Sequence, residues 1–129
     1  MLNPDPDAVL ARLRAFCLAL PETTEKPVHG VPGFYVAGKL FAHFRHDHQG
    51  DGMTVAGVRI SGRDEQEALL TSRPEIYSVR SSASPANWIA MSLAEPDWAL
   101  VEARLLASWR LAAPKRLLPL PLRGKGTTG

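Results

Sequence analysis

The chain has 129 residues, 45% of them hydrophobic, and a formal charge of +2 at pH 7, as is typical of one soluble globular domain. No apolar run approaches the ~20 residues that span a bilayer. The acidic, proline-rich start is unlike a secretory signal, and the single cysteine, Cys17, has no partner for a disulfide or a metal site. We therefore expect a cytoplasmic, bacterial-type monomer without a cofactor or a membrane association.

The positive charge is concentrated toward the C-terminal end. No acidic residue follows Glu102, so the last 27 residues carry six positive charges, against a net −4 for the rest of the chain. This asymmetry favours contact with an anion. A solvated helix face followed by a soluble tail is an equally weighted alternative.

The first predicted element is a helix over residues 6–20. Asp5 and Pro6 suit an N-cap and a first helical position, apolar residues recur at helical spacing up to Leu20, and Pro21 ends the run. Cys17 lies on the apolar stripe, which favours a buried small hydrophobic side chain over a reactive thiol.

A charged, turn-rich connector is expected next, followed by an antiparallel hairpin over residues 34–45. Gly38 supplies the positive φ of a tight turn between the two strands. The alternation of side chains predicts an apolar underside of Phe34, Val36, Leu40, Ala42 and Phe44, and an upper side of Lys39, Phe41, His43 and Arg45.

The remaining elements are a strand over 53–60, a short helix over 61–70, strands over 76–80 and 88–93, and a helix over 96–113. Alternation points Arg59, Arg80 and Trp88 outward from the three strands. The last helix carries a buried stripe at steps of three or four residues.

Tight turns rather than long crossovers join several strands, so the sheet should be mainly antiparallel. Both terminal helices must bury their apolar stripes on one sheet face. The sequence therefore predicts a two-layer α+β sandwich, formed by a single domain over residues 1–117, with an extended or disordered tail over 118–129. The other sheet face would gather Lys39, Phe41, His43, Arg45, Arg59, Arg80 and Trp88.

Catalytic and metal-binding patterns are weak. The serines lack a nucleophile elbow, and an exposed turn explains Glu25 and His29 more readily than acid–base chemistry does. His43 and His46 would lie on opposite faces of a strand, and His46 and His48 would chelate a metal only if their loop curls. We therefore assign no catalytic residue and no metal ligand.

The basic, aromatic-bearing sheet face is the leading candidate site. Cations on strands suit phosphate contacts, and neighbouring rings suit base stacking. We predict a non-enzymatic DNA-binding protein of weak sequence specificity, which uses Lys39, Phe41, Arg45, Arg59, Arg80, Trp88, Lys115 and Arg116. The alternatives are a protein- or small-molecule-binding module and, less favoured, an enzyme that uses His29 and Glu25.

Several ordered motifs, which together span residues 8–117, resemble the MmcQ/YjbR family of small bacterial proteins. The matching segments are Cys17-Leu18-Ala19-Leu20-Pro21, Glu25-Lys26-Pro27, Pro32-Gly33-Phe34, Gly38-Lys39-Leu40-Phe41-Ala42, Trp88-Ile89, Asp97-Trp98 and the run from Ser108 to Arg116. The resemblance implies an α+β fold similar to frataxin (CyaY-like). It also implies DNA binding, through the family's likeness to a double-wing DNA-binding domain.

Overall fold

The computed structural model describes residues 5–47, 50–81 and 84–118. Their six strands form one sheet in the order β1-β2-β3-β4-β6-β5, and each neighbouring pair is antiparallel. The helices are α1 (Pro6–Leu18), α2 (Arg63–Ser72) and α3 (Trp98–Ala112), followed by a short 3-10 helix, η2 (Lys115–Leu117). The strands are β1 (Thr23–Val28), β2 (Val31–Val36), β3 (Lys39–His46), β4 (Thr54–Arg59), β5 (Tyr77–Ser78) and β6 (Trp88–Ser92).

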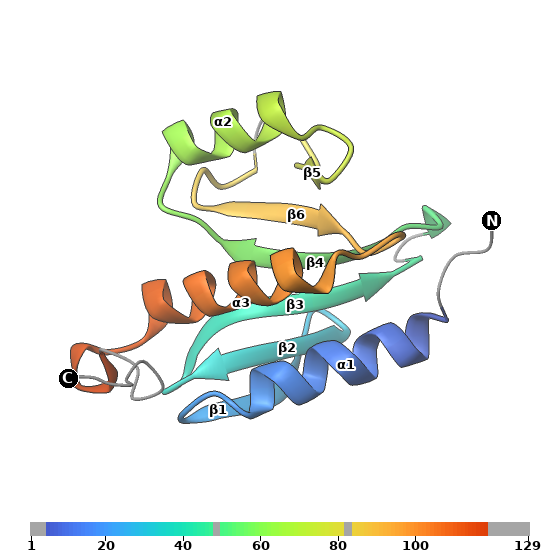
Figure 1. Cartoon of the computed structure of the whole chain (residues 1–129). Coiled ribbons are helices and arrows are strands. Elements are labelled where there is room, and N and C mark those ends of the chain that lie inside the picture. Colours follow the sequence, from blue (N-terminus) through green and yellow to red (C-terminus); the bar gives the residue numbers. More distant parts are fainter. Residues whose placement is uncertain (1–4, 48–49, 82–83, 119–129) are drawn as a thin grey trace.

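Helices α1 and α3 cover one face of the sheet, and α2 lies beyond β6, at the β5 end of the sheet (Figure 1). The expected α+β fold with an antiparallel sheet is thus confirmed. Asp5 caps α1 by accepting a hydrogen bond from the Asp7 N–H, and Asp97 caps α3 through the Leu100 N–H. Apart from Leu118, the predicted tail lies outside the described residues.

The core fills the space between the sheet and the two long helices. Its largest fully buried side chains are Trp109, Phe34, Phe41, Leu13, Met91, Leu93 and Leu105. The Trp109 indole N–H donates to the Pro21 carbonyl at 3.2 Å, which ties α3 to the segment after α1. Cys17 is fully buried here, and burial raises the pKa of its thiol to about 12, as expected of a structural cysteine.

The predicted connector after α1 is instead a strand, β1. Its residues pair with β2 in the register Glu25↔Phe34 and Pro27↔Pro32. The prolines and charges there suggested turns. However, β1 is an edge strand, and a proline is tolerated where no ladder hydrogen bond is required of it. The sheet therefore has six strands, where the sequence predicted five.

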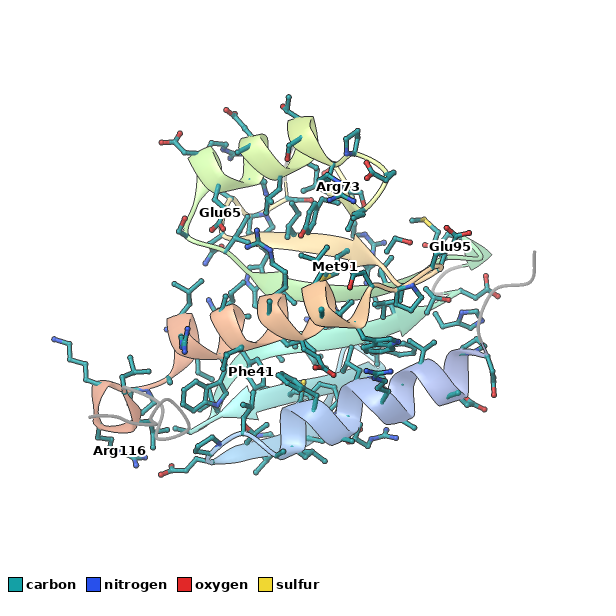
Figure 2. All side chains as sticks on the ribbon, viewed as in Figure 1. Phe41, Glu65, Arg73, Met91, Glu95 and Arg116 are labelled. Atoms are coloured by element: carbon teal, nitrogen blue, oxygen red, sulfur yellow. The ribbon has the colours of Figure 1, made fainter. Side chains whose placement is uncertain are left out.

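The alternation predicted for the start of β3 is also wrong, because β3 contains a bulge. Phe34 pairs with Ala42, but the next residue of β2, Tyr35, pairs with Leu40. Phe41 is therefore the extra residue, and its side chain is fully buried between the sheet and the helices (Figure 2). The bulge moves the side chains of the residues before it to the opposite faces of the sheet. Leu40 lies on the open face, and Lys39 lies on the helix side because it pairs with Val36, a core residue.

Candidate nucleic-acid interface

The sheet face opposite α1 and α3 is hollowed, with a volume of about 600 Å³. Cross-strand partners share a face, so the pairs His43↔Gly57 and Arg59↔Trp88 place these residues away from the helices. The polar and aromatic lining of the hollow is His29, His43, Arg45, Arg59, Arg80, Ser84 and Trp88. Val28, Val31, Leu40, Val79 and Pro85 supply apolar walls.

Two stacked aromatic rings line the hollow. The His43 imidazole and the Trp88 indole have their centroids 5.7 Å apart and their planes at 30°. His43 lies on β3 and Trp88 on β6, so Gly57 of the intervening strand β4 must leave room for the imidazole. A Cβ atom at Gly57 would lie 2.2 Å from His43 Nε2. Glycine at this position therefore allows the imidazole to lie flat on the sheet.

Arg59 is held from both sides of the sheet. Its Nε donates to the Leu40 carbonyl at 2.7 Å, and its guanidinium lies 4.8 Å from the Trp88 ring centroid, within range of a cation–π interaction. Behind the sheet, the Arg59 backbone N–H donates to the Oγ of Ser108 on α3, which in turn donates to the Phe41 carbonyl. The Phe41 bulge and α3 thus fix the position of Arg59.

Positive charge is crowded in the hollow. Burial and the neighbouring Arg80 lower the pKa of Arg45, which Asp51 partly offsets, although a guanidinium stays charged at neutral pH. No carboxylate of the described residues lies within ion-pair distance of Arg45 or Arg59. The buried atoms His43 Nδ1 and Arg45 Nε have no hydrogen-bond partner among the described residues. An anion with hydrogen-bond acceptors would suit both the charge and the unpartnered Nε–H.

The structure brings four of the eight predicted contact residues together. Arg45, Arg59, Arg80 and Trp88 all line the hollow. Phe41 is in the core and does not contact solvent, so its predicted place on the open face is wrong.

The other three predicted contact residues do not line the hollow. Lys39 is exposed at the end of the hairpin, on the helix side of the sheet. Lys115 and Arg116 lie on η2, after α3. Arg116 forms a two-bond ion pair with Glu22, one bond being 2.7 Å, and this contact lowers the pKa of Glu22.

Sequence reasoning placed His43 on the open face but gave it no role, and it missed Gly57. The signal for Gly57 was available, since a glycine inside a strand pattern often marks the close approach of another group. His29 also lines the hollow, whereas the sequence pattern suggests only a pairing with Glu25. Contacts across three strands depend on strand register, and a shift of one residue moves every side chain of a strand to the opposite face.

Glu25 and His29 are not brought together as a catalytic pair. Glu25 pairs across the strands with the core residue Phe34 and accepts two hydrogen bonds from Arg14 of α1, at 2.7 and 2.9 Å. This contact lowers the pKa of Glu25. Because His29 lines the hollow on the other face, Glu25 cannot reach it without breaking the Arg14 ion pair.

No cluster of three potential metal ligands occurs among residues 5–47, 50–81 and 84–118. His46 Nδ1 shares a hydrogen bond with the Thr54 hydroxyl at 2.7 Å. His48 lies outside the described residues, and so does part of the loop whose curling would be needed for the two histidines to chelate a metal. Within the described part of the chain, no helix has the length and hydrophobicity to cross a membrane.

The folded protein should lose stability in mild acid because of His43. Burial, followed by Arg45, His29 and Arg80, lowers the His43 pKa to about 4, whereas an unfolded chain titrates near 6.5. Neutral His43 is therefore favoured by folding. The contribution of His43 to the free energy of unfolding is complete above pH 6.5 and is lost as the pH falls toward 4, by on the order of 3 kcal/mol.

Urea unfolding at pH 7, 5 and 4 measures this loss. A His43→Gln variant should show a flatter pH dependence than the unmodified protein. His46→Gln, on the same strand but exposed, serves as the control and should keep the original dependence. Parallel curves for His43→Gln and the unmodified protein would contradict the assignment.

Comparison with known proteins gives a family and a fold. A family model described as YjbR matches residues 18–111. Among solved structures, the chain is similar to Deinococcus radiodurans protein DR2400, whose domain is described as DUF419, with 19% identity and a TM-score of 0.63 over 79% of this chain and 76% of that chain. At this identity the similarity supports the fold alone. No curated protein gives a significant match.

Proposed function

The chain belongs to the YjbR family, and from this premise we propose that it binds DNA through the hollow on its open sheet face. The observation that carries the proposal is the convergence of Arg45, Arg59 and Arg80 with the stacked His43 and Trp88 rings in one concave site. Guanidinium groups suit phosphate oxygens, and aromatic rings that line a site suit bases of any sequence. The protein would thus be a non-enzymatic, weakly sequence-specific DNA-binding protein of bacterial type.

The number of cations limits the expected affinity. Three arginines line the hollow, and each neutralised phosphate of a single strand contributes about −0.7 to the slope of log K against log salt concentration. We therefore expect a slope near −2 and dissociation constants of about 1–100 μM at physiological salt. Base identity should matter little, because stacking on a ring discriminates weakly among bases.

Fluorescence anisotropy with labelled single-stranded and duplex DNA, at salt concentrations from ~50 to ~200 mM, tests the proposal. Binding with the slope given above supports it. No detectable binding at the lowest salt, or an affinity that does not change with salt, overturns it. DNA strands of different base composition, titrated in the same experiment, test the weak sequence specificity.

A second candidate is a module that binds a small anionic molecule. The concavity favours it, because a volume of about 600 Å³ lies in the range of small-ligand sites. In that case the same arginines would hold a free ligand, and polymeric DNA would bind no more tightly than its monomer units. The anisotropy experiment, repeated with competing mononucleotides, separates the two candidates.

A further inference from the structure

We propose that the hollow holds a single unpaired nucleotide, with its base against the Trp88 and His43 rings and its phosphate against Arg45 and Arg80. This inference rests on the proposed DNA binding and makes it more specific: the protein would bind unpaired rather than duplex DNA. It follows from the size of the hollow, the positions of the rings and the two unpartnered polar atoms.

The size of the hollow suits one nucleotide. Its volume of about 600 Å³ is enough for one base with its sugar and phosphate and falls within the range of small-ligand sites. The rings lie inside this concave surface, between β3, β4 and β6, rather than on a projecting edge. A base stacked within a duplex cannot reach such a surface without leaving its partner, at a cost of a few kcal/mol, whereas an unpaired base can enter directly.

The polar groups of the hollow suit the phosphate end of a nucleotide. The buried Arg45 Nε has no partner among the described residues, and Arg80 lies close enough to lower the pKa of Arg45. A phosphate between the two arginines would relieve their repulsion and accept charge-assisted hydrogen bonds. The buried Nδ1 of His43 also has no partner among the described residues, so a hydrogen bond to the base or the sugar would satisfy it.

Gly57 provides a test that leaves every charge in place. Because a Cβ atom there would lie 2.2 Å from His43 Nε2, Gly57→Ala must push the imidazole off the sheet and into the hollow. The arginines remain, so contacts that depend only on charge should persist. If a nucleotide occupies the hollow, its binding should fall by at least about tenfold.

The probes are 5′-dAMP, a ten-nucleotide single strand and a blunt duplex of the same sequence, titrated by Trp88 fluorescence and by anisotropy. We expect dAMP to quench the tryptophan fluorescence of the unmodified protein but not that of Trp88→Phe. Gly57→Ala should weaken the binding of dAMP and of the single strand. The binding of the duplex, which is weaker in the unmodified protein, should not change. His43→Ala/Gly57→Ala should bind dAMP as His43→Ala does, because without the imidazole the added methyl group has room.

The outcomes separate this inference from the proposed function. DNA binding without dAMP quenching, and with Gly57→Ala unchanged, would overturn the nucleotide-sized site and leave DNA binding in place. Quenching by dAMP with no DNA binding would overturn the proposed function but keep a nucleotide in the hollow. Circular dichroism checks that Gly57→Ala folds. Should it not fold, Trp88→Ala replaces it, with its dAMP affinity measured by calorimetry because the Trp88 signal is gone, and unchanged dAMP affinity would equally overturn the inference.

Discussion

Replacing Arg45 and Arg80 by glutamine is expected to weaken single-stranded DNA binding by about 100-fold at ~50 mM salt. Each lost charge-assisted phosphate contact should cost about 1.4 kcal/mol of binding free energy, which is about tenfold in affinity. The slope of log K against log salt concentration should become shallower by about 1.4, from about −2 to near −0.7. Both quantities come from the same anisotropy titration.

The Arg45→Gln change in this double variant should not destabilise the folded state. Burial and repulsion from Arg80 already disfavour the charged form of Arg45, and a neutral glutamine removes that repulsion. A loss of binding at unchanged stability could therefore not be attributed to unfolding. Urea unfolding of both proteins checks this point, and a large drop in stability would show that the arginines have structural partners that matter more than the proposed ligand.

Arg110→Gln/Lys115→Gln is the matched control for Arg45→Gln/Arg80→Gln. It removes the same net charge from exposed positions on α3 and η2, which do not line the hollow. We expect less than about a threefold change in affinity, because well-separated exposed charges are screened. Equal losses in the two double variants would mean that binding follows overall charge and not the open face. The control also tests Lys115, which the sequence had assigned to the interface.

The sequence was sufficient to predict the overall architecture. The amphipathic stripes of the two long helices and the tight turn at Gly38 do not depend on distant contacts, so fold class and helix placement followed from local pattern. Arg59 and Trp88 were also placed correctly, because β4 and β6 alternate without interruption and pair directly at these two residues.

The positions of Lys39 and Phe41 could not be predicted in the same way. A bulge adds one residue to β3 without any local sequence requirement. The carbonyl of the bulge residue Phe41 accepts a hydrogen bond from Ser108, which is 67 positions away in the sequence. The same limitation applies to Gly57 and His43, which meet only when β3 and β4 are in register. The site could be predicted strand by strand, but the contacts between strands could not.

Phe41→Ala distinguishes the exposed Phe41 that the sequence pattern predicts from the buried Phe41 of the structure. An exposed Phe41 that stacks on a base would lose DNA affinity on truncation and little stability. The structure predicts the opposite, since the ring is fully buried against the helices and its removal leaves a cavity. The free energy of unfolding should fall by about 3–5 kcal/mol, and urea unfolding followed by circular dichroism measures it.

Trp88→Ala is the counterpart of Phe41→Ala and should give the reverse result. Trp88 is only half-buried and contacts Arg59 and His43, so its loss should lower stability by about 1–2 kcal/mol but weaken single-stranded DNA binding about tenfold, as loss of one stacked base would. Phe41→Ala, assayed where it is still folded, should bind within about twofold of the original. If Phe41→Ala instead lost affinity and kept its stability, the bulge would be absent. Lys39 and Phe41 would then return to the open face, as unbroken alternation along β3 requires.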